Sequence, residues 1–173
     1  VFLGAFFYAI VYTVWLKRRT WLNIVFGGLA GSWAVLAGAT AADPQLGAVP
    51  LALALVLFLW TPPHFWSLAI AFRDDYAAAG VPMLPVVVGD QRAANTIFGS
   101  TLALVAASML PLAFGLGAIY FAGAASGGFL FLQKAWRLTR DPCRKTAMVC
   151  FHASLIQLTV VLVAAIVDAQ FAS

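Results

Sequence analysis

Charged side chains are scarce in this sequence, and one kind is missing. Glutamate does not occur, so aspartate supplies all six acidic residues, and only 9% of the 173 residues are charged. Soluble domains carry about a quarter charged residues, so this composition excludes an ordinary soluble domain. A hydrophobic content of 64% and a mean hydropathy of +0.97 instead predict an integral membrane protein.

Several other signals are also weak or absent. Cys143 and Cys150 are the only cysteines, and we predict two unpaired thiols rather than a disulfide framework. The net charge of +4 forms no basic stripe interleaved with aromatic residues, so we expect no nucleic-acid partner. Residues 1–16 are apolar without a basic n-region or a cleavage site, which is not typical of a signal peptide. They look like a helix already in progress, and we expect the chain to be truncated at its N-terminus.

Long apolar runs occupy most of the chain. A membrane-spanning helix needs about 20 predominantly apolar residues. Six candidates meet or approach this length, at residues 1–16 (cut short), 21–42, 48–71, 94–114, 116–135 and 146–168. We therefore predict an all-α integral membrane protein with six transmembrane helices, forming a single domain over residues 1–173.

The distribution of the ten basic residues agrees with this count. With six spans, they all fall in three connections on one side of the membrane: Lys17–Arg19, Arg73 to Arg92, and Lys134–Lys145. The opposite side keeps only Asp43 and Asp168. Since Lys and Arg accumulate in cytoplasmic loops, we expect the basic connections to face the cytoplasm, or the matrix in a mitochondrion.

A polar stripe follows one face of the predicted helix 48–71. Its members recur at helical spacing and continue into the next connection: Trp60, His64, Ser67, Ala71 and Asp74. The pair Pro62-Pro63 predicts a kink in the same helix. Because ionisable groups inside a membrane are costly and often functional, we predict a substrate or proton-transfer role for His64. A satisfied hydrogen bond between helices is the alternative.

The connection 73–92 is the longest in the chain. We expect its first part to form a short helix ended by Gly80, a residue suited to a helix C-terminus. The apolar run Val81–Val88 follows, and we expect it to pack as a lid-like loop over the mouth of a cavity. A plain interfacial segment is the alternative.

Charges near this connection suit a phosphorylated ligand. Mg²⁺ binds polyphosphates through one or two carboxylates, such as Asp74 and Asp75, and Arg and Lys neutralise the remaining phosphate charge. An apolar cavity below would accept a hydrocarbon tail. If a diphosphate leaves, aromatic faces such as those of Trp60 and Tyr76 would stabilise an allylic cation. Ordinary juxtamembrane charge is the alternative explanation.

Two groups of motifs carry a family resemblance. The first comprises Tyr12-Thr13, Leu16-Lys-Arg-Arg-Thr20, Asn23-Ile24 and Gly27-Gly-Leu-Ala-Gly31, and the second comprises Pro62-Pro-His-Phe-Trp-Ser-Leu-Ala69, Asp75-Tyr76 and Ala79-Gly-Val-Pro-Met-Leu-Pro-Val86. Together they resemble the heme O synthase (protoheme farnesyltransferase) branch of the UbiA-type membrane prenyltransferases. The resemblance covers essentially the whole chain, although the last three predicted helices match only in hydrophobicity and length.

The resemblance implies a fold and a reaction. Members of this family have nine transmembrane helices, of which this chain resembles helices four to nine. They transfer a farnesyl group from farnesyl diphosphate to a vinyl group of protoheme (heme B) to give heme O, with Mg²⁺ as the divalent cation. The bacterial inner membrane, or the mitochondrial inner membrane, is the implied location. Membrane lipid, heme A synthase and the assembly of terminal oxidases are the implied partners.

The resemblance also implies residue roles. Asp74 and Asp75 would hold the metal. Diphosphate binding would fall to Lys17, Arg18, Asn23 and Arg73, catalysis to Arg73, Tyr76, Asp75 and His64, and heme binding to His64 and Trp60.

This chain departs from the superfamily pattern in two places. The first aspartate-rich motif of the family lies in a region that this sequence does not include, so we expect this stretch to be inactive by itself. The second motif commonly has two aspartates four apart, whereas Ala78 and Ala79 follow Asp74 and Asp75 at that spacing. The alternatives are another UbiA-type prenyltransferase acting on an aromatic ring or porphyrin side chain, a transporter using the His64 stripe, and a non-enzymatic assembly protein.

Overall fold

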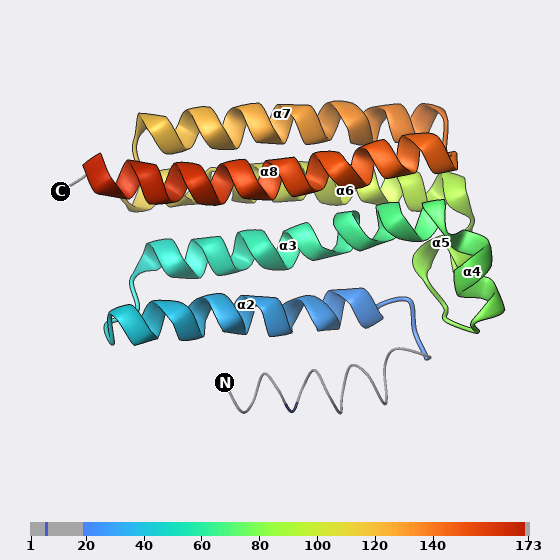
Figure 1. Ribbon diagram of the computed structural model, residues 1–173, viewed down its shortest axis with the longest axis horizontal. Helices are drawn as coiled ribbons and strands as arrows, with labels where there is room; N and C mark the ends of the chain where they lie inside the picture. The colour runs from blue at the N-terminus through green and yellow to red at the C-terminus, as the bar shows by residue number, and fades with distance from the viewer. Residues whose placement is uncertain (1–5, 7–18, 172–173) are drawn as a thin grey trace.

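The computed structural model describes Phe6 and residues 19–171, and every regular element in this part is a helix. The order is α2 (Asn23–Ala42), α3 (Ala48–Ala71), α4 (Arg73–Ala78), α5 (Leu84–Val88), α6 (Asp90–Ala107), the 3-10 helix η2 (Leu110–Phe114), α7 (Ala118–Arg140) and α8 (Arg144–Phe171). The long helices run side by side, and the short helices α4 and α5 lie together at one end of the bundle (Figure 1). The prediction of an all-α fold is confirmed.

Four of the described segments are long and apolar enough to cross a membrane: Asn23–Ala42, Ala48–Ala71, Asp90–Phe114 and Arg144–Phe171. The protein is therefore an integral membrane protein. The predicted span 116–135 is a 23-residue helix, α7, which is not among these four because Gln133, Lys134, Arg137 and Arg140 interrupt its apolar run. The predicted span 1–16 falls outside the described residues. The count of six spans is thus not confirmed.

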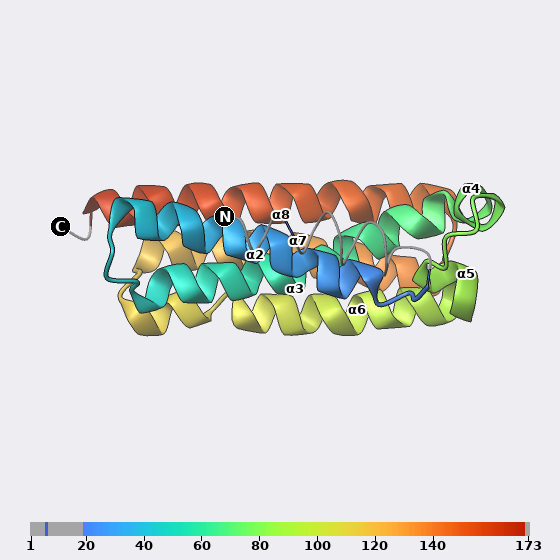
Figure 2. The same cartoon turned by 90° about the horizontal axis from the view of Figure 1, so that it is seen from below.

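Helix α3 is central to the packing. It contacts α2 on one side and α6 and α8 on the other, while α7 packs against α6 and α8 (Figures 1 and 2). Small residues permit close approach between these helices. A Cβ added to Gly28 would lie 3.1 Å from Cβ of Thr61 on α3, and one added to Gly127 would lie 3.2 Å from Cα of Gln157 on α8.

The end of the bundle opposite α4 and α5 is held by a carboxylate. Asp168, near the end of α8, is 4% exposed and accepts hydrogen bonds from the backbone N–H groups of Gly117, Ile119 and Tyr120. These donors belong to the first turn of α7, whose N–H groups have no partner within the helix. Asp168 is therefore the N-terminal cap of a neighbouring helix, and it ties α8 to α7.

Candidate functional site

The connection after α3 forms two short helices, and α6 begins earlier than expected. Helix α4 covers Arg73–Ala78, and Gly80 follows it with φ of +65°, which confirms a short helix ended at this glycine. Helix α6 begins at Asp90 rather than after residue 92. The predicted loop boundary was wrong because Gly89, at φ +82°, turns the chain directly into the next helix.

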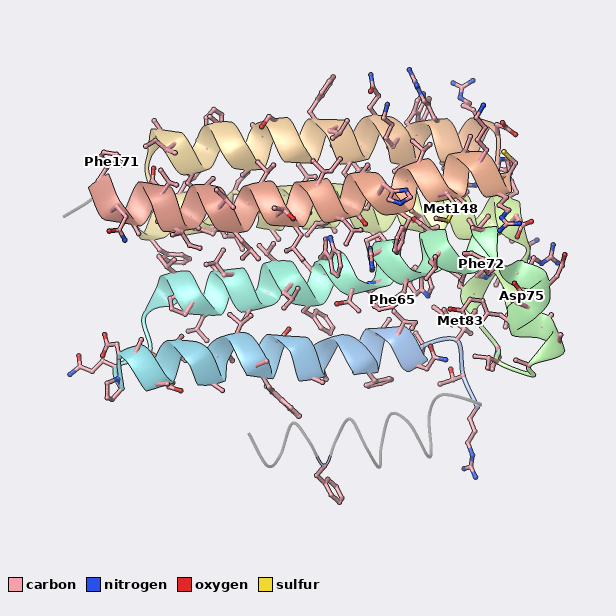
Figure 3. The ribbon with its side chains drawn as sticks, in the orientation of Figure 1. Phe65, Phe72, Asp75, Met83, Met148 and Phe171 are labelled. Atoms are coloured by element: carbon pink, nitrogen blue, oxygen red, sulfur yellow. The ribbon has the colours of Figure 1, made fainter. Side chains whose placement is uncertain are left out.

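The apolar run of this connection packs inward. Met83 and Leu84 are each 2% exposed and belong to the same hydrophobic core as α3 and α6. Figure 3 shows Met83 close to the junction of α3 and α4. The segment is thus anchored to the end of the bundle by buried side chains, whereas its role as a lid over a cavity stays a prediction.

A polar cavity of about 450 Å³ opens where α3 meets α4. It is lined by Ile70, Ala71, Phe72, Arg73, Asp74, Asp75, Asp90 and Arg144. The fold thus brings Arg73, Asp74 and Asp75 together, as predicted from their adjacency in sequence. It adds Asp90 from α6 and Arg144 from α8, which the sequence patterns did not single out.

The charges in this cavity are only partly paired. Nη1 of Arg73 lies 3.4 Å from Oδ2 of Asp90, and both side chains are partly exposed, at 44% and 29%. Such a pair contributes about 0–1 kcal/mol. Oδ1 of Asp90 is buried and has no hydrogen-bond partner among the described residues. The guanidinium carbon (Cζ) of Arg144 lies 5.1 Å from the centre of the Phe72 ring.

The residues of this cavity suit a divalent cation that keeps part of its water shell better than a cation enclosed by protein ligands alone. In the described part of the chain, no three His, Cys or Asp side chains converge as a metal cage. The cavity holds three carboxylates and two guanidinium groups, a formal charge of −1, so it would repel a free polyphosphate. Mg²⁺ usually takes one or two carboxylates and completes its shell with water and phosphate oxygens. One or two of the carboxylates of Asp74, Asp75 and Asp90 would supply that arrangement, and Asp90 also pairs with Arg73.

Tyr76 lies on the other side of Asp75. A second cavity of about 360 Å³ is lined by Phe72, Asp75, Tyr76, Ala79 and Val81, so Asp75 borders both cavities. Partial burial raises the pKa of the Tyr76 phenol above its ordinary value. The phenol therefore stays neutral at physiological pH and can donate a hydrogen bond.

His64 and Trp60 lie deeper in the bundle, between α3 and α8. Nδ1 of His64 lies 2.7 Å from Oγ of Ser154, and Nε1 of Trp60 donates to the carbonyl oxygen of Ser154 at 2.8 Å. The His64 ring stacks between Trp60 and Phe151, with ring centres 4.0 and 4.5 Å apart. The alternative of a hydrogen bond between helices is therefore realised, and only Nε2 of His64 is left for a substrate contact.

The remaining predicted site residues that the structure describes do not line the polar cavity. Asn23 is 1% exposed at the start of α2, and neither it, His64 nor Trp60 lines the polar cavity. Lys17 and Arg18 lie outside the described residues. Three members of the predicted polar stripe, Trp60, His64 and Ser67, are buried against α8 in the described part of the chain.

Asp90 and Arg144 are the functional candidates that sequence reasoning missed. Asp90 is the only other acidic residue in the connection that carries Asp74 and Asp75, and it follows a glycine. This position in the sequence could have identified Asp90 as a candidate. Arg144 was counted only as one of several basic residues, and no local pattern distinguishes it from Lys145.

Comparison with known proteins gives a consistent result. The family model described as UbiA prenyltransferase family matches residues 1–156. Paramagnetospirillum magneticum has two similar curated proteins: protoheme IX farnesyltransferase 2, 61% identical over 97% of this chain and 58% of the relative, and protoheme IX farnesyltransferase 1, 53% identical over 97% and 60%. Protoheme IX farnesyltransferase 1 of Cenarchaeum symbiosum is 45% identical over 98% of this chain and 57% of the relative. The chain thus spans less than two thirds of their length. No solved structure matches.

Proposed function

Because this chain belongs to the UbiA prenyltransferase family, we propose that its protein transfers a farnesyl group from farnesyl diphosphate to a vinyl group of protoheme, giving heme O. The observation that carries the proposal is the identity of 61% and 53%, over nearly the whole chain, to two proteins named protoheme IX farnesyltransferase. The polar cavity at the α3–α4 junction supports it, since it combines carboxylates with guanidinium groups.

The reaction breaks the bond between the first farnesyl carbon and its diphosphate oxygen, and the electron pair leaves with the diphosphate. The vinyl group of the heme attacks the resulting allylic cation, water supplies a hydroxyl, and one proton is released. Mg²⁺, when bound, would neutralise charge on the leaving diphosphate. The protein's task is then to hold the diphosphate, shield the cation and present the vinyl group.

Each side chain near the cavity has a proposed task. Two carboxylates drawn from Asp74, Asp75 and Asp90 hold the divalent cation, and Asp90 replaces the second aspartate of the superfamily motif, at whose spacing this chain has Ala78 and Ala79. Arg73 and Arg144 bind phosphate oxygens, for which guanidinium geometry is well suited. Lys17, Arg18 and Asn23 are proposed to join them, and the Tyr76 phenol donates a hydrogen bond to the departing diphosphate.

The heme is proposed to lie toward the α3–α8 interface. His64 would meet it through Nε2, because Nδ1 is engaged by Ser154, and Trp60 would hold the His64 ring in place. The basic end of the bundle, including α4 and α5, would face the cytoplasm of a bacterial inner membrane, or the mitochondrial matrix. Heme A synthase or the assembly machinery of terminal oxidases would then receive the product.

The test is a product assay on the full-length protein. Purified protein in detergent or liposomes receives protoheme, farnesyl diphosphate and Mg²⁺, and the extracted pigments are identified by mass spectrometry. A farnesylated, hydroxylated heme is the expected product. A prenylated quinone precursor formed instead would show another prenyltransferase. An assembly role would be shown by three results together. Cells that lack the protein would lose heme O, the purified protein would form no product in vitro, and the Asp75→Ala variant would fully restore heme O in those cells.

A further inference from the structure

A second charged cavity lies on the other side of the first turn of α8. Its volume is about 260 Å³, and it is lined by Lys134 and Arg137 of α7, Asp141, and Lys145, Thr146 and Val149 near the start of α8. None of the three cations forms an ion pair with any carboxylate of the described residues. Figure 3 shows nitrogen-tipped side chains projecting outward from this end of α7. The cavity therefore keeps a net positive charge among the described residues.

An apolar cavity lies further along the same pair of helices. It has a volume of about 360 Å³ and is lined by Ile119, Gly123, Thr159, Val160, Val163, Ala164 and Val167. On α7, Ile119 and Gly123 share one helical face with Lys134 and Arg137, because all four lie within about 60° at 100° per residue. On α8, Val149, Val160, Val163 and Val167 share one face in the same way. Both cavities therefore lie along the same side of the α7–α8 pair, and the name α7–α8 groove denotes these two cavities together.

The spacing of the two cavities matches a lipid. Lys134 and Gly123 are eleven residues apart, as are Val149 and Val160, which corresponds to about 16 Å along a helix. An acyl chain spans half of a hydrocarbon core about 30 Å thick. Lys134 also lies about 9 Å before the end of α7, a depth from which a lysine reaches the headgroup layer by extending its stem. Trp136, 47% exposed and stacked with Arg140 at 4.7 Å, is typical of this interfacial level.

We propose that the α7–α8 groove binds one anionic phospholipid. Lys134, Arg137 and Lys145 bind the phosphate of the headgroup, and an acyl chain fills the cavity beside Gly123 and Val163. The carboxylate of Asp141 borders the headgroup cavity and opposes the anion, so the net charge offered is +2. This site is separate from the proposed diphosphate site, since the two cavities have no lining residue in common.

The test measures lipid retention by the full-length protein. The protein is delipidated, incubated with equal amounts of phosphatidylglycerol and phosphatidylcholine, and examined by native mass spectrometry. We expect one phosphatidylglycerol to be retained in preference to phosphatidylcholine. Removing both lysines (Lys134→Gln with Lys145→Gln) should weaken retention about fivefold for each charge. The matched control, Arg92→Gln with Arg140→Gln, removes the same charge from the same end of the bundle and should retain the lipid.

Further variants distinguish a loss of lipid binding from a loss of folding. Asp141→Asn should strengthen retention, which no unfolding effect would produce. Val163→Trp fills the acyl cavity and should displace the lipid, whereas Ile166→Trp, at an exposed position outside the cavity, should not. Lys134→Arg with Lys145→Arg should preserve binding.

Three results would overturn the proposal. Equal retention of phosphatidylcholine would show that charge is not recognised. An equal loss of lipid retention in the double lysine variant and in the double arginine control would show only a general charge effect. Displacement of the lipid by inorganic phosphate at the same phosphate concentration would show a site for free phosphate rather than for a lipid.

Discussion

Nδ1 of His64 lies 2.7 Å from Oγ of Ser154, although the two residues are 90 positions apart in sequence. The contact joins α3 to α8 beneath the polar cavity, and Ser154 also accepts the indole N–H of Trp60 through its carbonyl oxygen. The orientation of the His64 ring is therefore set by Trp60 of α3 and by Ser154 and Phe151 of α8.

Substitutions in this pair separate a structural role from a substrate contact. His64→Phe keeps the ring stacked between Trp60 and Phe151 but removes both ring nitrogens. Ser154→Ala removes only the partner of Nδ1. Each should lower the free energy of unfolding by about 1 kcal/mol. If Nε2 meets the heme, His64→Phe should reduce heme O formation at least tenfold, while Ser154→Ala changes it less than threefold. Equal activities in the two variants would assign His64 to packing alone.

Asp75 and Asp90 should both matter for turnover, since they border the same cavity from α4 and α6. We expect Asp75→Asn to reduce kcat about 100-fold and Asp90→Asn about tenfold, by analogy with the loss of a group that stabilises developing charge. Both should raise the Mg²⁺ concentration needed for half-maximal rate, and a chelator should abolish activity in the parent protein. Asp43→Asn, at the opposite end of the bundle, is the matched control. An unchanged Mg²⁺ dependence in all three variants would show that Asp75 and Asp90 do not bind the metal.

Asp168 should contribute to stability rather than to catalysis. Asp168→Ala leaves three N–H groups of the first turn of α7 without their acceptor, so we expect a loss of about 2 kcal/mol in the free energy of unfolding. Asp168→Asn keeps one carbonyl acceptor and should lose about half as much. Thermal unfolding in detergent provides the measurement. Asp43→Ala should stay within about 0.5 kcal/mol of the parent, and a similar loss there would argue against a specific cap.

Glycine substitutions test the close packing of α7 on α8. A Cβ at residue 127 would lie 3.2 Å from Cα and 3.4 Å from the carbonyl oxygen of Gln157, and backbone atoms cannot move aside cheaply. Gly127→Ala should therefore destabilise the protein by about 1–3 kcal/mol. Gly99→Ala is the control, because nothing lies within 4 Å of the added atom, and it should be neutral or stabilising by up to about 1 kcal/mol. Equal effects at the two positions would contradict the packing argument.

Local pattern was enough to identify the membrane class, the all-α fold and the family. The predicted span 48–71 coincides with α3, since a long apolar run in a membrane must satisfy its backbone groups internally and so forms a helix. The short helix before Gly80 was also predictable, because a positive φ is easiest for glycine. Arg73, Asp74 and Asp75 lie in one cavity largely because they are neighbours in the chain.

Contacts between distant segments were decided only by the tertiary structure. Asp90 and Arg144 meet the α4 aspartates because α6 and α8 both begin at this end of the bundle, which no local pattern encodes. In the same way, Asp168 is an ordinary aspartate in the sequence and becomes the cap of α7 only when the two helices pack. Helix formation depends on neighbours along the chain, whereas the partner of a buried polar group depends on how helices are paired. The sequence therefore determined the all-α membrane class and the family, and the packing of α3, α6, α7 and α8 determined which charges share a cavity.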